Sequence, residues 1–188
     1  MRIVVSGTHA SGKSTLISDF AAAHPEYLVL PDPFEELIDD RFDELDAVLF
    51  SRQLDIAAHR LAELPAGSNV IAERGPVDFL AYLHALDALG RPGRSRASIA
   101  RGAALTRQAT EQIDLVALVP LAYRDQIAVS EDEDLELRDA MNDALLDLAA
   151  DPDLIGLRVA ELAGDRAERL AQLEAATLRP STSDQLPS

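Results

Sequence analysis

One short segment near the start of the chain constrains its fold more than any other feature. Residues 7–14 read Gly-Thr-His-Ala-Ser-Gly-Lys-Ser and fit the pattern G-x-x-x-x-G-K-[ST] at every defined position. Lys13 is the only lysine of the chain, and all the others of its 17 Lys and Arg residues are arginines. A compact ammonium charge is therefore needed here, because the broad planar fork of arginine cannot replace it. The segment predicts a loop that binds phosphate groups.

The residues on either side of this loop support the prediction. Arg2 to Ser6 is a β-branched run typical of a buried parallel strand, and Lys13 to Ala23 has apolar residues at helical spacing. When a strand, a loop and a helix follow one another in this order, the backbone N–H groups of the loop and the positive end of the helix dipole face the phosphates. We expect Lys13 to reach the β- and γ-phosphates, the Ser14 hydroxyl to bind Mg²⁺ and Thr15 to contact the α-phosphate. The residues expected to contact the nucleotide here are Gly7, His9, Ala10, Ser11, Gly12, Lys13, Ser14 and Thr15.

Length, charge and composition exclude several classes of function. The 188 residues make one ordinary domain, which we expect over residues 1–177, followed by a frayed tail over 178–188. The chain has no cysteine, so it forms neither disulfides nor thiolate metal sites. A formal net charge of −16 is unfavourable for binding nucleic acid or an anionic membrane. With no apolar stretch near the roughly 20 residues of a membrane span and a first strand at residue 2, we expect a cytoplasmic protein.

Positive charge is concentrated in residues 90–110, which carry arginines and no acidic residue. This segment is either a solvated loop and helix face or a contact for an anion near the phosphate loop. Its arginines are Arg91, Arg94, Arg96, Arg101 and Arg107.

Five expected strands alternate with helices along the chain. This alternation predicts an α/β fold of three layers, in which a five-stranded parallel sheet has helices on both faces. The expected strands are Arg2 to Ser6, Tyr27 to Pro31, Asn69 to Glu73, Leu115 to Pro120 and Gly156 to Glu161. The expected helices are Lys13 to Ala23, two within Pro33 to Leu64, Val77 to Leu89, one ending near Gln112, Asp134 to Ala149 and Asp165 to Thr177.

The phosphate loop predicts nucleotide binding but leaves the use of the nucleotide open. A GTPase normally carries an Asn-Lys-x-Asp guanine reader, which this chain lacks because its single lysine lies in the loop. A ring-forming ATPase needs a helical lid domain and an acidic pair after an apolar strand, whereas the chain is short and offers only Glu73. A small-molecule kinase remains, in which functional groups gather at the carboxyl ends of parallel strands.

Three residues at expected strand ends fit phosphoryl transfer. Asp32 follows the second strand, and Glu73 and Arg74 end the third. The reaction requires a carboxylate that deprotonates the acceptor, oxygen ligands for Mg²⁺ and positive charge around the transferred phosphoryl group. Each residue also has a structural alternative: Asp32 as a helix N-cap for Phe34, and Glu73 with Arg74 as a local ion pair. His9 faces the nucleotide, the acceptor or solvent.

With these motifs in place, the chain resembles the P-loop nucleoside and nucleoside monophosphate kinase-like group. It is most similar to small bacterial AAA-labelled ATPases related to ribosylnicotinamide kinases. The resemblance rests on the loop sequence, the Asp-Pro turn at Asp32 and the run Glu-Arg-Gly-Pro-Val-Asp-Phe-Leu at residues 73–80. It implies the sheet order 2-3-1-4-5, an acceptor-side carboxylate at Asp32, a metal-side acid at Glu73 that acts through water, and a phosphate-binding Arg74.

Two further regions take their meaning from the same resemblance. Such kinases carry an arginine-rich lid after the fourth strand, where this chain offers only Arg124 and Arg138. Arg124 is either a lid arginine or a solvated side chain. Arg138 is either a lid arginine or the partner of Asp134, which lies one helical turn earlier. Gly164, followed by Asp165, resembles a turn that contacts adenine through backbone groups.

The sequence therefore predicts an ATP- and Mg²⁺-dependent phosphotransferase that acts on a nucleoside-like or other small acceptor. The main alternative is a regulatory NTPase that binds or slowly hydrolyses ATP and signals to a partner. A third is a degenerate fold that keeps the nucleotide without chemistry. The acceptor and the oligomeric state are left open by the sequence, and a homodimer is one arrangement compatible with it.

Overall fold

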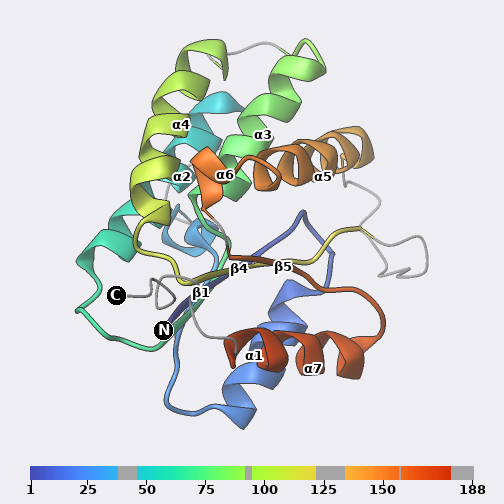
Figure 1. The fold of residues 1–188 in the computed structure, drawn as a ribbon. Helices are drawn as coiled ribbons and strands as arrows, with labels where there is room; N and C mark the ends of the chain where they lie inside the picture. Colours follow the sequence, from blue (N-terminus) through green and yellow to red (C-terminus); the bar gives the residue numbers. More distant parts are fainter. Residues whose placement is uncertain (38–45, 92–94, 122–133, 157, 179–188) are drawn as a thin grey trace, which may run out of the picture.

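A single parallel sheet lies at the centre of the molecule (Figure 1). The computed structural model describes residues 1–37, 46–91, 95–121, 134–156 and 158–178. Within them the strand order is β2-β3-β1-β4-β5, which confirms the order expected from the sequence. Every strand lies inside its expected range. The strands are β1 (Arg2–Ser6), β2 (Leu28–Leu30), β3 (Val70–Glu73), β4 (Leu115–Leu118) and β5 (Val159–Glu161).

Helices cover both faces of the sheet. Figure 1 shows α1 and α7 on one face and α2 to α6 on the other. The helices are α1 (Lys13–Ala23), the 3₁₀ helix η1 (Pro33–Leu37), α2 (Ala47–Glu63), α3 (Pro76–Ala88), α4 (Ser95–Thr110), α5 (Leu135–Ala149), α6 (Pro152–Ile155) and α7 (Arg166–Thr177). None of these helices is long and apolar enough to cross a membrane.

The helical boundaries follow the sequence closely, with one addition. Asp151 and Pro152, which follow the expected helix Asp134 to Ala149, begin the short helix α6. Pro152 occupies its first turn, where a missing N–H costs nothing, and the Asp151 carboxylate accepts a hydrogen bond from the Asp153 N–H. The expected tail lies outside the described residues except for Leu178.

The central strand β1 separates two apolar layers. Ile3 and Val5 pack with α1 and α7, whereas Val4 points to the opposite face, because side chains alternate along a strand. On that opposite face α3 is buried on nearly all sides between α2, α4 and α5, which explains its continuous run of apolar residues. The sheet and α3 therefore form a rigid base under the loops that follow β1, β2 and β3.

The strand order brings three loops to one edge of the sheet. The chain runs in the same direction in β2, β3 and β1, so their carboxyl ends lie side by side. Val5 of β1 is opposite Glu73 of β3 in the register. The phosphate loop after β1, the turn after β3 and Asp32 after β2 are neighbours for this reason.

Candidate nucleotide and acceptor site

Glycines give the phosphate loop its shape. A Cβ atom on Gly7 would lie 2.6 Å from the carbonyl oxygen of Val119, so no larger residue fits there. Gly12 adopts a left-handed conformation (φ 93°) immediately before α1. No side chain caps the N-terminus of α1, which leaves its first N–H groups facing the loop. This arrangement suits an anion at the helix N-terminus.

Lys13 lies under the loop, with only 4% of its surface exposed. Its ammonium donates a hydrogen bond of 2.7 Å to the carbonyl oxygen of Thr8. Burial, together with the charge of Arg74, lowers the pKa of Lys13 to about 7 against the opposing effect of Asp78, Glu73 and Asp32. A buried cation with so few compensating charges gains strongly from a phosphate placed beside it.

The lowered pKa of Lys13 predicts how stability depends on pH. Because the pKa is about 7 in the folded protein and 10.5 ordinarily, the unfolded chain binds more protons between these values. The free energy of unfolding should therefore rise with pH in this window, by at most about 1.4 kcal/mol per pH unit. Urea denaturation at pH 7 to 9, carried out without nucleotide on the wild type and on Lys13→Met, measures this dependence of the free energy of unfolding on pH. Parallel pH profiles of the two proteins would contradict the burial of a charged lysine.

Ser14 and Glu73 form the candidate metal position. The Ser14 hydroxyl donates a hydrogen bond of 2.8 Å to the Glu73 carboxylate, and both residues line the same cavity. A hydroxyl and a carboxylate are hard oxygen donors, which fit Mg²⁺. Among the described residues no cluster of three or more His, Cys, Asp or Glu side chains could hold a metal alone. The donor set therefore fits an ion that completes its coordination with water and phosphate oxygens, as Mg²⁺ prefers.

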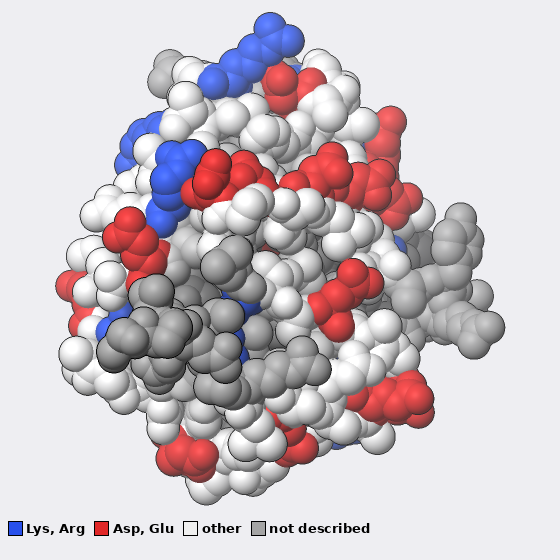
Figure 2. Space-filling view, viewed as in Figure 1, with Lys and Arg blue, Asp and Glu red and all other residues white. Residues whose placement is uncertain are grey.

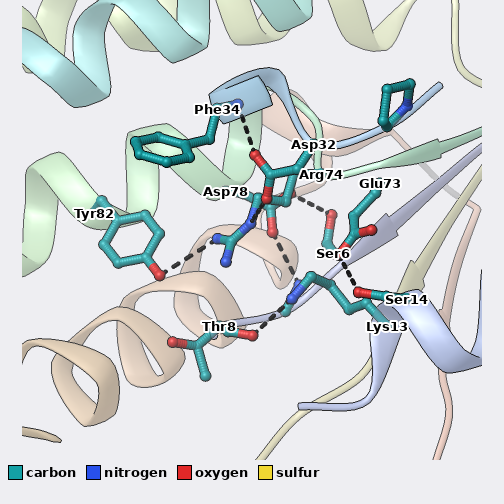
Figure 3. A network of polar contacts seen from close by, with 12 residues as sticks. Ser6, Thr8, Lys13, Ser14, Asp32, Phe34, Glu73, Arg74, Asp78 and Tyr82 are labelled. Atoms are coloured by element: carbon teal, nitrogen blue, oxygen red, sulfur yellow. Dashed lines mark hydrogen bonds and ion pairs between the residues drawn. The ribbon is translucent and has the colours of Figure 1, made fainter. Parts of the chain in front are cut away.

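Arg74 links Asp32 and Tyr82 on the side of the cavity opposite the phosphate loop (Figure 3). Its Nε donates a hydrogen bond of 2.7 Å to Asp32, and its guanidinium carbon lies 5.4 Å from the centre of the Tyr82 ring. The other oxygen of Asp32 accepts a 2.9 Å hydrogen bond from the Phe34 N–H, so Asp32 both caps η1 and faces the cavity. Glu73 and Arg74 contact Ser14 and Asp32, respectively, and the structure records no ion pair between them.

The backbone of Arg74 is strained. Its φ is +65°, in a region that a residue with a side chain seldom adopts, and the residue is 8% exposed. Its N–H donates to the carbonyl oxygen of Val5. Burial alone would lower the pKa of the guanidinium, but Tyr82 and Asp32 raise it, so Arg74 stays charged. Such strain at a cavity is typical of a functional residue.

Asp78, which we did not predict as a site residue, fixes the turn after β3 to the phosphate loop. Its carboxylate is fully buried and accepts hydrogen bonds of 2.8, 2.9 and 2.8 Å from the Ser6 hydroxyl, the Gly7 N–H and the Gly75 N–H. Burial raises the pKa of Asp78, whereas Arg74 and these donors lower it. The signal in the sequence is an acidic residue three positions after Gly75, as in a capping box.

Two arginines far away in the sequence hold the outside of the phosphate loop. The Arg138 side chain on α5 donates to the carbonyl oxygens of His9 (2.9 Å) and Ala10 (3.4 Å). Arg169 on α7, which the sequence did not single out, donates 3.0 Å to the Ser11 carbonyl oxygen. The alternative pairing of Arg138 with Asp134 is wrong, because that carboxylate binds other groups. Arg124 lies outside the described residues.

Three described arginines of residues 90–110 form ion pairs with carboxylates that do not line the cavity, and a fourth, Arg107, donates to the backbone carbonyl oxygen of Asp153. Arg91 pairs with Asp134, at 2.9 Å from Nη2 to Oδ1, which explains why that carboxylate is not available to Arg138. Arg96 pairs with Asp87, and Arg101 on α4 pairs with Asp55 on α2. Figure 2 shows arginines beside carboxylates on this part of the surface. Of the two alternatives for this segment, these ion pairs favour the solvated face for Arg91, Arg96 and Arg101, while Arg94 lies outside the described residues.

These groups surround one cavity of about 700 Å³. Its loop side consists of His9, Ala10, Ser11, Gly12, Lys13, Ser14 and Thr15. Its opposite side consists of Asp32, Phe34, Glu35, Phe50, Gln53, Glu73, Arg74, Phe79 and Tyr82. Two expected contacts are not among the lining residues: Gly7 lies behind the loop, and Gly164 lies in the turn before α7. Their contacts with a nucleotide stay predictions, as does the orientation of exposed His9.

Solved structures share this fold at low sequence identity. The deoxyadenosine kinase of M. mycoides with bound dATP is 13% identical, with a TM-score of 0.68 over 94% of this chain and 99% of that one. NadR in complex with NR is 18% identical, with a TM-score of 0.66 over 93% of this chain and 51% of that one. The thymidylate kinase of Candida albicans is 16% identical, with a TM-score of 0.61 over 92% and 88%.

Sequence comparison identifies the family. None of the curated proteins matches the chain in sequence. A family model described as an AAA domain matches residues 2–169, from the first strand to α7. Together with the sheet order and the fold shared with P-loop kinases, this match covers the phosphate loop and every residue of the cavity. The chain belongs to this AAA domain family.

Proposed function

We propose that the protein is an ATP- and Mg²⁺-dependent phosphotransferase that acts on a hydroxyl group of a small, nucleoside-like acceptor. One observation carries the proposal: the Asp32–Arg74 pair lies in the same cavity as Lys13 and Ser14. The groups proposed for a nucleotide and for an acceptor thus line one open cavity of about 700 Å³. The shared fold of kinases that act on nucleosides and nucleotides supports this proposal.

The residues suggest a direct transfer. The acceptor oxygen attacks the γ-phosphorus of ATP while the bond from phosphorus to the β,γ-bridging oxygen breaks, and the hydroxyl proton passes to Asp32. The products are ADP and the phosphorylated acceptor. Lys13 and Arg74 place fixed positive charge beside the phosphoryl oxygens, which is the main protein contribution to such reactions.

Other residues position these groups. Ser14, together with Glu73 through water, would hold Mg²⁺, which when bound neutralises charge on the phosphate oxygens. Arg74 orients the carboxylate of Asp32 through their 2.7 Å hydrogen bond. Arg138 donates hydrogen bonds to carbonyl groups on the outer side of the loop. Of the two lid arginines predicted from the sequence, it is the one that the structure describes, and we propose that it approaches the phosphates.

The proposal predicts that Asp32→Asn removes most of the acceptor-dependent turnover. Asparagine keeps the size of the side chain and an oxygen that accepts the Phe34 N–H, but it does not accept a proton from the acceptor. General-base catalysis contributes roughly 10²- to 10⁴-fold, so we expect kcat to fall by a factor in this range. ADP formation with each compound of a panel of nucleosides, nucleotides, nicotinamide riboside and sugar-like alcohols is the measurement.

A matched control separates this effect from a loss of local charge. Glu36→Gln changes an exposed carboxylate of η1 that pairs with Arg60 and does not line the cavity. Its turnover should equal that of the wild type. Full activity in Asp32→Asn would reject Asp32 as the base. If no compound raised ATP turnover in the wild type, the protein would instead be a regulatory NTPase or an inactive nucleotide-binding protein.

A further inference from the structure

Arginines from two helices hold the carbonyl groups of the phosphate loop. Arg138 on α5 donates to the carbonyl oxygens of His9 at 2.9 Å and Ala10 at 3.4 Å. Arg169 on α7 donates to that of Ser11 at 3.0 Å. In a trans peptide the C=O of one residue and the N–H of the next point in opposite directions. An arginine that holds these carbonyl groups on the outer side therefore turns the following N–H groups inward, where a phosphate would bind.

The loop needs this support because part of its backbone is strained. Ala10 has a φ of +52°, a left-handed conformation that is unfavourable for a residue with a side chain. Arg138 binds the carbonyl oxygen of the peptide group on each side of Ala10. Its guanidinium is a charged donor, which forms stronger hydrogen bonds than a neutral donor. Arg138 is therefore the side chain that stabilises this strained residue from both sides.

Asp134 is a competing partner for Arg138. It is the N-cap of α5 and lies one helical turn before Arg138, in the order in which a carboxylate and an arginine pair on a helix. A guanidinium binds a carboxylate more strongly than a neutral carbonyl group. This local pair does not form because Arg91 binds both oxygens of Asp134, with Nη1 on Oδ2 and with Nη2 at 2.9 Å from Oδ1.

Arg91 lies away from the groups of the cavity. It follows α3, where its N–H donates 2.9 Å to the carbonyl oxygen of Leu86, and neither Arg91 nor Asp134 lines the cavity. Its guanidinium also lies 3.2 Å from the carboxylate of Glu136. An effect of Arg91 on the phosphate loop would therefore pass through the first turns of α5, which carry Arg138.

We infer that Arg91 is a positioning residue for the phosphate loop: by occupying Asp134 it leaves Arg138 to hold the loop carbonyl groups. The inference rests on the nucleotide-binding part of the proposed function and not on the acceptor. It assigns a function to an ion pair of a kind that ordinarily contributes little. This positioning acts before the nucleotide binds, and it adds to the proposed approach of Arg138 to the phosphates.

Calorimetric titration of the full chain with ADP and Mg²⁺ tests the inference. Arg138→Met should raise the Kd for ADP roughly 10-fold or more, because charge-assisted hydrogen bonds to the loop are lost. Arg91→Met should raise it about 3- to 10-fold, since a loop correctly held in only about a tenth to a third of the molecules loses affinity in that proportion. Adding Asp134→Asn to Arg91→Met should restore most of the affinity, because asparagine keeps the N-cap oxygen but does not attract Arg138.

Two comparisons exclude a purely structural effect. Arg96→Met removes an exposed ion pair from the same arginine segment, and its Kd for ADP should stay within about two-fold of the wild type. Arg91→Met should have no further effect in an Arg138→Met background, because both substitutions act through one side chain. An undiminished effect in that background, unchanged binding in Arg138→Met, or no recovery with Asp134→Asn would each overturn the inference.

These results are distinguishable from the outcome for the proposed reaction. The expected pattern of ADP binding, without ATP turnover on any acceptor, would contradict the phosphotransferase function and support the positioning role of Arg91. Turnover with an acceptor, together with unchanged ADP binding in Arg91→Met, would do the reverse. Absence of ADP binding in the wild type would reject nucleotide binding at the phosphate loop and the inference with it.

Discussion

Lys13→Ala should reduce acceptor-dependent ATP turnover by roughly 10²- to 10³-fold, the usual cost of removing one preorganised group that stabilises the transition state. Lys13 is 4% exposed beneath the phosphate loop, and its ammonium donates a hydrogen bond of 2.7 Å to the backbone carbonyl oxygen of Thr8. Its charge is held in place before the substrate arrives. Because the chain has no other lysine, no second ammonium group can take its place.

Two measurements make this prediction specific. Lys13→Arg keeps the charge, but a planar guanidinium does not fit the buried position of a compact ammonium, so we expect it to restore little activity. Urea denaturation without nucleotide should show no loss of stability in Lys13→Ala, because burying the Lys13 charge is costly in the nucleotide-free wild type. Steady-state kinetics with ATP and the best acceptor gives the activity. Undiminished turnover in Lys13→Ala would overturn the assignment of the phosphate site.

Much of the fold was predictable because its signals are local. The phosphate loop has a fixed spacing of Gly and Lys residues, and the strands are short β-branched runs between turn residues. The order of the strands came from family resemblance, and the structure confirms it. Asp32, Glu73 and Arg74 were predictable as neighbours because they follow adjacent parallel strands. Their proposed roles are not tested by this arrangement alone.

The rest of the site depends on contacts between residues that are distant in sequence. Gln53 and Tyr82 lie on helices whose sequences read as ordinary buried faces, and only the packing of α2 on α3 places them in one cavity. A local pairing of Arg138 with Asp134 was reasonable at helical spacing. It is absent because Arg91, 43 positions before Asp134, occupies that carboxylate. Competition between local and distant partners is not visible in a single sequence.

The segment of arginines shows the same limit. Five arginines close together in sequence suggested either a solvated face or a shared contact for an anion. In the structure those with described acidic partners point to different helices, and each pairs with a different carboxylate. A cluster along the chain becomes a set of separate ion pairs because helical side chains radiate in several directions.

Asp78→Ala should lower the free energy of unfolding by about 3 kcal/mol or more, because it breaks a buried hydrogen-bonded network in which three donors share one acceptor group. The substitution leaves the Ser6 hydroxyl and the N–H groups of Gly7 and Gly75 without their acceptor. Each unsatisfied buried group costs about 1–3 kcal/mol. Asp78→Asn should lose less, because its amide oxygen still accepts at least one of these bonds.

The same helix offers a matched control for this prediction. Asp87 on α3 pairs with Arg96, whose side chain is 87% exposed, and exposed pairs contribute less than about 1 kcal/mol. Urea denaturation of Asp78→Ala and Asp87→Ala should therefore give clearly different midpoints, and equal midpoints would show that the Asp78 network contributes no more than a surface ion pair. In Asp78→Ala the turnover should fall by more than the loss of stability alone explains. The Asp78 carboxylate joins the start of the phosphate loop to the turn that holds Arg74 at φ +65°, so its loss also releases the strained residue that we propose to contact the transferred phosphoryl group.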